Sequence, residues 1–436
     1  MISILSDLFN QFSYYLNNSM IFTLAFLPFL IIEAPIYISI VIGVIYYYWK
    51  VRNYIVDDNF TPSVTCIVPC YSEEAGALRC IKSLVNQDYK GNIQIIAIVD
   101  GSIKNKKTYD LLMNYWKQLN NPNRELIVIG KYERQGRVSS LNLGLYLSKY
   151  EIICVLDGDN RNSLDMVSII TQNYRDPNVV AGSGTLFPEN QNASIVTMMQ
   201  SIEYTLGICL GRTGLATLGT LNNISGGFGT FRRKILTEVG AWDAGTAEDL
   251  DLTIRLKQRI KLHPNEKLFF DPKAICYTDV PETIGIFFKQ RLRWNGDLGY
   301  LYLRKKWRTF YYNLMGIKNG IYTAWYGVLH QIVCPLLIFI YTLFFAFTDT
   351  YRFVIVGAIV YLLYLSLNIM LYILYWTLLS THKKNDLILV LFLPLFPVFT
   401  YISRLWDVVA HLNEAFRNGH LDSSMAPKHI LKRSKF

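Results

Sequence analysis

The sequence is poor in charged residues and has no cysteine pattern typical of a metal site or a disulfide framework. Only 17% of its 436 residues are charged and 51% are hydrophobic, which is an apolar balance for a water-soluble enzyme. Its seven cysteines form no C-x-x-C pair and have no regular spacing, so we expect reduced thiols and no structural zinc. Cys66 and Cys154 lie in apolar, strand-like runs, where a cysteine acts as a packing residue. Internal repeats and low-complexity tracts are absent as well.

The net charge of +10 does not require a nucleic-acid partner, because the basic residues border the apolar segments. Cytosolic flanks of membrane helices carry an excess of Lys and Arg, and anionic headgroups attract them. The residues concerned are Lys50, Arg52, Arg304, Lys305, Lys306, Arg308, Lys383, Lys384 and the tail from Lys428 to Lys435. We therefore expect membrane lipids, and no nucleic acid, among the partners.

Apolar residues concentrate at 20–49 and from about 320 to 405, which predicts an integral membrane protein with one water-facing domain between these regions. No positively charged segment precedes the first run, and the run is long, so we expect an anchor and not a cleaved signal peptide. Lys50 and Arg52 follow it, which places the next segment in the cytosol.

Two later apolar runs, 321–347 and 352–379, are long enough for a membrane hairpin that returns to the cytosol. A third run, 387–403, contains two prolines and leaves alternatives open. If it spans the membrane, the basic tail lies outside, against the charge bias; otherwise the run is re-entrant or interfacial. Residues 282–300 are amphipathic and are expected at the membrane surface.

Between these regions, short β-rich runs alternate with longer segments of helical pattern. The expected strands are 64–68, 93–99, 126–129, 152–156 and 179–181. Helices are expected at 75–87, 138–149 and 163–174. This alternation predicts an α/β fold with a mostly parallel sheet flanked by helices. Ligands of such sheets bind beyond the carboxyl ends of the strands, which is where the motifs below fall.

The triplet Asp157-Gly158-Asp159 ends the strand at 152–156. Two carboxylates at a strand end can hold Mg²⁺ or Mn²⁺ through oxygen, with substrate phosphates completing the coordination. Asp100 follows the strand at 93–99 and could accept hydrogen bonds from a nucleobase or ribose, although an ordinary Asp-Gly turn is the preferred interpretation of this motif taken alone. Tyr71 and Glu73 follow the first strand and could meet a uracil ring, or simply mark a strand exit before a helix cap.

The run Ala247-Glu248-Asp249, with Asp251, opens a helical segment. Clustered carboxylates suit a general base for a sugar hydroxyl, whereas an acidic helix N-terminus is the structural alternative. The glycine-rich stretch 225–230, which includes Gly227 and Phe228, lets a bulky substrate approach the backbone and lacks the lysine of a P-loop.

Arginine side chains supply candidate phosphate contacts. Arg134 and Arg137 add positive charge near phosphates or solvate a loop. The pentad 290–294 combines Gln290, Arg293 and Trp294, which suits a diphosphate and a sugar ring side by side; an amphipathic membrane helix is the alternative. Deeper in the chain, His330 and Gln331 interrupt an apolar run, as expected either for a polymer path or for ordinary helix packing.

In this order and spacing the motifs resemble the membrane-embedded family 2 glycosyltransferases, which include cellulose, chitin, hyaluronan and poly-β-1,6-N-acetylglucosamine synthases. The resemblance covers about 64–300 and is strongest to the last group. Three stretches carry that likeness: Gly229–Arg233 leading to Glu238–Gly240, Glu248–Asp251, and Pro281–Thr283 leading to the pentad 290–294. The chain departs from the pattern at Val99, where many members have aspartate, and it has no W-G-T-R-like gating motif.

The resemblance implies a GT-A fold and a role for each matching position. Tyr71, Glu73 and Asp100 would contact the nucleoside, and Asp157 and Asp159 would hold nucleotide and metal. Asp249 would be the catalytic base. Gln290 and Arg293 would contact the diphosphate, and Trp294, with Gly227 and Phe228, the acceptor.

We therefore expect an inverting, metal-dependent glycosyltransferase with a UDP-sugar donor and a polysaccharide acceptor, N-acetylglucosamine before glucose. One alternative adds a single sugar to a lipid acceptor, and another is a non-catalytic nucleotide-sugar-binding membrane component. An accessory membrane subunit would be compatible with either enzyme. The predicted organisation is an anchor (1–52), a cytosolic catalytic domain (53–281), interfacial helices (282–319), a transmembrane region (320–408) and a basic tail (409–436).

Overall fold

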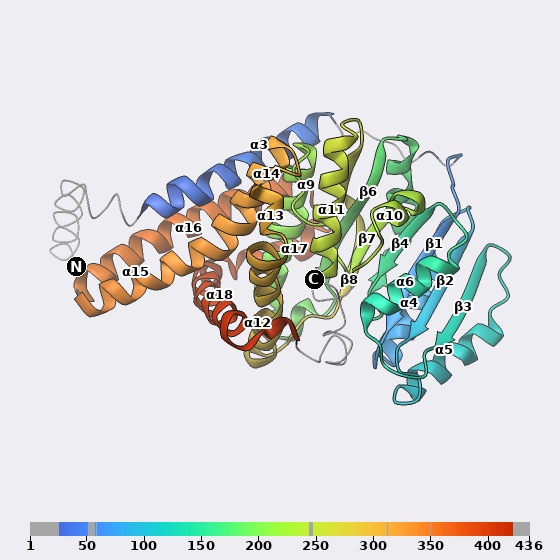
Figure 1. Ribbon diagram of the computed structural model, residues 1–436. Helices are drawn as coiled ribbons and strands as arrows, with labels where there is room; N and C mark the ends of the chain where they lie inside the picture. Colours follow the sequence, from blue (N-terminus) through green and yellow to red (C-terminus); the bar gives the residue numbers. More distant parts are fainter. Residues whose placement is uncertain are drawn as a thin grey trace.

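A computed structural model describes residues 26–50, 57, 59–243, 247–311, 313–348 and 350–421. The start of the predicted anchor and most of the basic tail lie outside these residues. Figure 1 shows a sheet with flanking helices at one end and long helices, drawn in blue and orange, that extend away from it. Helices α11 (Glu248–Leu262) and α12 (Ile284–Tyr300) lie between the two parts.

The described residues form one eight-stranded sheet in the order β3-β2-β1-β4-β7-β6-β8-β5. Its strands are β1 Val64–Cys70, β2 Ile93–Val99, β3 Arg124–Gly130, β4 Ile152–Leu156, β5 Arg161–Asn162, β6 Val179–Pro188, β7 Phe228–Arg232 and β8 Lys267–Thr278. Neighbouring strands are parallel from β3 to β4 and between β6 and β8. β7 runs antiparallel to both β4 and β6, and β5 antiparallel to β8. The predicted mostly parallel sheet is confirmed.

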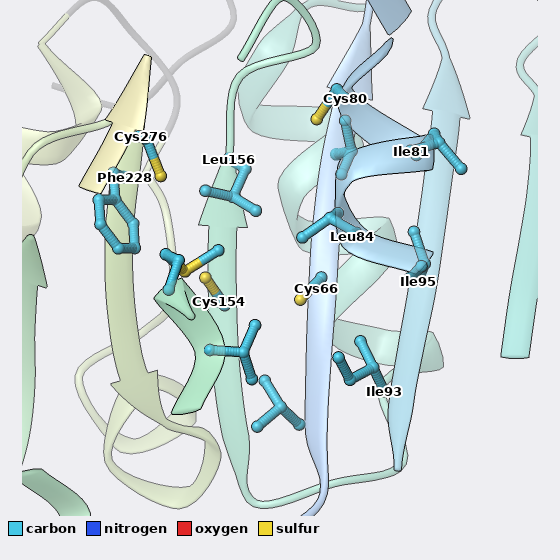
Figure 2. Close-up of a cluster of buried hydrophobic side chains, with 14 of the residues drawn as sticks. Cys66, Cys80, Ile81, Leu84, Ile93, Ile95, Cys154, Leu156, Phe228 and Cys276 are labelled. Atoms are coloured by element: carbon cyan, nitrogen blue, oxygen red, sulfur yellow. The ribbon is translucent and has the colours of Figure 1, made fainter. Parts of the chain in front are cut away.

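Strands β1, β2 and β4 are buried along their whole length, because helices cover both faces of the parallel half of the sheet. The helices around the sheet are α4 Ala75–Val85, α5 Lys106–Gln118, α6 Arg137–Leu147, α7 Met166–Gln172 and α10 Arg233–Glu238. Figure 2 shows one core layer, in which Cys154 and Leu156 of β4 lie between Cys66 of β1 and Phe228 of β7. Both cysteines are fully buried, as their apolar surroundings predicted.

Three helical stretches among the described residues are long and apolar enough to cross a membrane: Phe26–Lys50, Ile317–Phe347 and Phe353–Leu378. They contain α3 Ala34–Lys50, α14 Ile317–Thr323, α15 Cys334–Thr348 and α16 Thr350–Leu378. Beyond them, α17 Lys383–Val390 and α18 Phe396–Arg417 form a pair bent by 49°. A short helix, α13 Trp307–Tyr311, follows α12.

Both ends of the bent pair contact elements of the sheet side. Just before α17, His382 Nε2 lies 3.2 Å from the Tyr277 hydroxyl of β8. Just after α18, the His420 ring stacks on Tyr300 of α12 at 4.0 Å. The pair therefore enters and leaves the helical region on the same side, which agrees with the re-entrant alternative and also places the end of α16 on the sheet side.

Helical segments at 195–217 connect the sheet to the long helices. Here α8 Ile195–Glu203 and α9 Arg212–Thr217 flank a π-helical segment, Tyr204–Gly211. Their buried apolar residues belong to one cluster with those of α3 and α16. By sequence this segment falls within the predicted catalytic domain, yet it packs with the helical region, which periodicity alone could not reveal.

Candidate active site

The predicted motifs lie at one edge of the sheet because β1, β2 and β4 are parallel neighbours. Tyr71 and Glu73 follow β1, Asp100 follows β2, and Asp157 and Asp159 follow β4. Three non-glycine residues near this edge, Ser72, Glu74 and Ala247, have positive φ angles of 69°, 47° and 55°. Such backbone conformations are costly and concentrate at functional sites.

Carboxylates gather beside the Asp157–Asp159 turn. A Cβ atom on Gly158 would lie 3.2 Å from the Glu73 carboxyl carbon, so Glu73 packs directly against the turn. Burial, with the charges of Asp157 and Glu73, raises the pKa of Asp159 to about 7. Burial also raises the pKa of Glu73. An excess of negative charge of this kind suits a divalent cation.

Among the described residues, no three Asp, Glu, His or Cys side chains converge as a complete metal site. Asp157 and Asp159 therefore fit a cation that takes further ligands from nucleotide phosphates, as magnesium and manganese commonly do.

Arg137, at the start of α6, joins three separate segments. Its guanidinium pairs with Asp157, donates to Glu248 Oε1 at 2.8 Å and donates to the Gly226 carbonyl at 2.7 Å. The sequence suggested only general positive charge at this position, because contacts between 137, 157, 226 and 248 depend on the tertiary fold.

Asp249, next to Glu248 on α11, also faces this edge of the sheet. Its Oδ2 accepts from the Gly226 amide at 3.0 Å and from Asn223 Nδ2 at 3.1 Å. No Lys or Arg of the described residues lies within ion-pair distance of it. Asp251 is 1% exposed and instead binds Arg255 at 2.7 Å and Lys306 at 3.0 Å. Only one carboxylate of this pair is therefore available to a substrate hydroxyl.

Two adjacent glycines bring the carboxylate motifs together. A Cβ atom on Gly227 would lie 2.7 Å from Asp157 Oδ2, and one on Gly226 would lie 3.4 Å from Asp249 Oδ2. The Gly227 carbonyl also accepts from Asn160 Nδ2 at 2.6 Å. Asp157 and Asp249, which are 92 residues apart, thus each lie against one glycine of this pair.

The predicted role of Phe228 does not agree with its position in the structure. It was predicted to contact the acceptor, but its side chain is fully buried in the sheet core. Phe228 begins β7 opposite Leu156, and strand alternation turns its ring inward (Figure 2). A glycine-rich stretch with one aromatic residue suits a strand edge as well as a substrate loop.

The residues predicted to contact the nucleoside differ in their exposure. The Arg134 guanidinium lies over the Tyr71 ring, 4.2 Å from its centroid, and Tyr71 is 40% exposed. Asp100 is buried and binds Lys131 at 2.7 Å and the amides of Gln135 and Gly136 at 2.9 and 2.7 Å. Asp100 thereby fixes the loop that carries Arg134; a nucleoside contact by its own side chain stays a prediction.

Helix α12 carries Gln290, Arg293 and Trp294, and Thr283 caps it by accepting from the Ile286 amide at 3.4 Å. Trp294 is 36% exposed, with the Arg291 guanidinium 4.9 Å from its ring centroid. Arg291 in turn pairs with Glu203 of α8 at 2.8 Å.

The buried Gln290 Oε1 has no hydrogen-bond partner among the described residues, which is costly unless a ligand supplies one. A cavity of about 260 Å³ begins beside Arg291 and Glu203 and continues into the helical region. Glu203 carries no sequence signal of its own, since isolated glutamates on helices are common.

Comparison with known proteins shows similarity over part of the chain. Residues 65–240 match the model of the family "Glycosyl transferase family 2". A poly-β-1,6-N-acetyl-D-glucosamine synthase from Staphylococcus aureus is 28% identical over 273 residues, which span 60% of this chain and 62% of the relative. The corresponding enzyme of Staphylococcus epidermidis is 28% identical over 285 residues, spanning 63% of this chain and 66% of the relative.

A solved structure shares the fold. A mannosyltransferase from Pyrobaculum calidifontis, in complex with GDP-mannose and Mn²⁺, has a TM-score of 0.55 at 16% identity, covering 88% of this chain and 99% of the other. The GT-A-type fold predicted from the motifs is thereby confirmed.

Proposed function

We propose that this chain, whose residues 65–240 match the model of glycosyl transferase family 2, transfers a sugar from a UDP-sugar to a growing β-linked polysaccharide at the membrane. The observation that carries the proposal is that Asp157 lies against Gly227 while Asp249 lies against the adjacent Gly226. A donor held at the first carboxylate is then next to a base at the second. N-acetylglucosamine is the first choice of sugar because the staphylococcal relatives are synthases of its polymer; glucose is the second.

Each residue has a defined task in this proposal. Asp249 takes the proton from an acceptor hydroxyl, and the oxygen attacks the anomeric carbon from the face opposite the diphosphate. Gln290 and Arg293 bind the diphosphate, and Trp294 holds the acceptor ring, so the reaction becomes effectively unimolecular. Tyr71 and Glu73 bind the nucleoside.

A divalent cation, Mg²⁺ or Mn²⁺, would be held by Asp157 and Asp159 and would stabilise negative charge on the departing UDP. The donor-set chemistry at this turn supports such a site, and the related fold from Pyrobaculum binds Mn²⁺. An excess of chelator should stop transfer, and full activity under chelator would remove the cation from the scheme.

The helical region supports secretion of the product, with the catalytic domain in the cytosol of a multi-pass membrane protein. Three apolar stretches are long enough to cross the membrane, and the 260 Å³ cavity runs from α12 into them. Transfer of one sugar to a lipid acceptor is the alternative, and product length separates the two. A non-catalytic nucleotide-sugar binder is disfavoured, since binding alone would not require Asp249.

The test supplies purified protein in lipid with labelled UDP-N-acetylglucosamine, UDP-glucose, UDP-glucuronate or GDP-mannose, each separately. We expect a polymer from one UDP-sugar, to be sized and digested with linkage-specific glycosidases. Asp249→Asn should abolish transfer and retain UDP binding, because the substitution removes the base and keeps the hydrogen-bond acceptor. Transfer at the wild-type rate by Asp249→Asn would reject the assignment of the base.

A further inference from the structure

Two cavities lie end to end in the helical region. The inner cavity, of about 260 Å³, begins beside Arg291 and Glu203. The outer cavity, of about 300 Å³, lies among α3, α15, α16 and α18. Four residues line both of them: Tyr37, Tyr364, Thr400 and Arg404. The two cavities therefore meet at these side chains.

A buried polar cluster occupies the meeting point. Arg404 of α18 donates to the His330 carbonyl at 3.0 Å and lies 2.9 Å from His330 Nε2. Glu33 is 2% exposed, and its Oε1 lies 3.5 Å from Arg404 and 3.4 Å from His330 Nδ1. The Tyr364 hydroxyl donates to the other oxygen of Glu33. Ionisable groups within a membrane helix bundle are costly and usually serve function.

The backbone at these positions is itself unusual. Glu33 ends a π-helical segment, Phe29–Glu33, and His330 lies within another, Ala324–Val333. A third, Tyr204–Gly211, contributes Leu206, Gly207, Leu210 and Gly211 to the inner cavity. π-Helical turns are rare and occur preferentially at functional sites. Two of these segments line the inner cavity and the first lines the outer cavity, so separate parts of the chain bring π-helical turns to both sides of the meeting point.

The chemistry of the lining indicates the ligand. Its charges are internally paired, Glu203 with Arg291 and Glu33 with Arg404, while Asp407 binds the Asn295 amide. Aromatic side chains contribute much of the outer wall, among them Phe29, Tyr37, Tyr341, Phe345, Phe353, Tyr361, Tyr364 and Tyr401. Aromatic faces with paired polar groups fit the C–H faces and hydroxyls of an uncharged glycan. A polymer of uronates would bring negative charge beside Glu33, Glu203 and Asp407.

We propose that Glu33, His330 and Arg404 form a polar gate between the two cavities, which opens for an uncharged glycan chain. The proposal rests on the polysaccharide synthase function above. Hydroxyl and amide groups of the passing glycan replace the hydrogen bonds of Arg404 and Glu33 in turn, so neither charged side chain is buried without a partner. Between products, the paired side chains keep the cavities separate and the membrane sealed to small solutes.

The gate can be tested without any UDP-sugar. The full-length protein is reconstituted in phosphatidylcholine–phosphatidylglycerol vesicles that contain radiolabelled glucose, and the release of glucose is followed. Glu33→Gln/Arg404→Gln removes the ion pair without leaving a single buried charge, and Arg404→Lys keeps the charge but loses the guanidinium fork. The matched control, Arg304→Gln/Glu414→Gln, removes an ion pair at 3.4 Å that also involves α18 and lines neither cavity.

We expect release to be about tenfold faster from the double gate variant than from the wild type, with Arg404→Lys between them, because the closed state loses its differential stabilisation. The control should match the wild type. Wild-type release from both gate variants, in protein that elutes as a single species, overturns the gate. If the double variant does not fold, Arg404→Lys is tested alone. Release faster than the wild type then supports the gate, and wild-type release overturns it. Absence of polymer from the wild type with every sugar donor would overturn the proposed function instead, whatever the release experiment shows.

Discussion

Gly227 lies between residues of the candidate site, where an added methyl group would meet the Asp157 side chain. Its Cβ atom would stand 2.7 Å from Asp157 Oδ2, closer than a side chain tolerates. Gly227→Ala should displace Asp157 or the loop that supports Asp249, and lower kcat by about 100-fold through misplacement of reacting groups. Gly285→Ala is the matched control, since nothing lies within 4 Å of its Cβ position. Steady-state kinetics on both variants check this, and equal rates would contradict it.

Lys257 on α11 is a buried lysine with one hydrogen-bond partner, Thr323 Oγ1 of α14 at 2.9 Å. Burial lowers its pKa to about 7, whereas a lysine in an unfolded chain titrates near about 10.4. Between these pH values the unfolded state binds more protons, so the stability of the folded state rises with pH.

Lys257→Met should therefore raise the melting temperature at pH 7, and its advantage should shrink as the pH rises toward 10. Thermal melting of detergent-purified protein at both pH values measures the difference. Lys261→Met, at an exposed position on the same helix, is the control and should show no such trend. An advantage that is constant with pH would mean that packing, and not charge burial, sets the effect.

Side chains that directly follow strand ends, such as Tyr71 and Asp157, could be predicted from the sequence as site residues. A parallel sheet brings those strand ends to one edge. Partners that are fixed only by tertiary contacts were not predictable. Glu203 reaches Arg291 across 88 residues, and Asp251 faces Lys305 and Lys306 although it lies two residues from Asp249. Phe228 shows the converse failure, since its strand β7 directly follows two glycines and was read as part of a glycine-rich stretch.

At the scale of elements, α3 and α9 approach each other closely at a contact of glycine against glycine. A Cβ atom on Gly43 of α3 would lie 2.1 Å from the Gly214 carbonyl of α9, and one on Gly214 would lie 2.5 Å from the Ile40 carbonyl. Small residues let backbones approach in this way within membranes. The contact joins the first apolar helix to the helix that directly follows the π-helical segment lining the inner cavity.

Gly43→Ala should push α3 away from α9 and destabilise the protein by about 1–3 kcal/mol, the usual cost of overpacking. Gly357→Ala on α16 is the control, because nothing lies within 4 Å of its Cβ position. Thermal melting in detergent compares them. A loss of stability that is the same in both variants would show that the close α3–α9 contact is not specific.

Among the elements themselves, strongly apolar strands were predictable and mixed ones were not. Strands β1, β2 and β4 are continuous apolar runs, which a parallel sheet covered on both faces requires. Strand β8 includes Lys267, Asp271, Pro272 and Lys273, and its register against β6 shifts, so no simple period marks it. The position of the helices at 195–217 was not predicted, because they pack against α3 and α16, which are distant in sequence.

For the whole molecule, the arrangement of ends decides how many times the chain crosses the membrane. The contacts of His382 with Tyr277 and of His420 with Tyr300 put both ends of the α17–α18 pair on the sheet side. From that arrangement we predict three crossings among the described residues, where helix length and composition alone would allow up to four. The positive-inside bias and the contacts then agree.

Accessibility to a membrane-impermeant maleimide tests this topology, since the cysteines of the described residues are all buried. Single cysteines replace Lys384, Arg417 and Phe347, all three of which are exposed. In sealed vesicles whose catalytic domain faces outward, the reagent should label the cysteines at 384 and 417 and leave the one at 347 unlabelled until detergent is added. Labelling at 384 without 417 would mean that α18 crosses the membrane, and the contact between His420 and Tyr300 could not then exist in the bilayer.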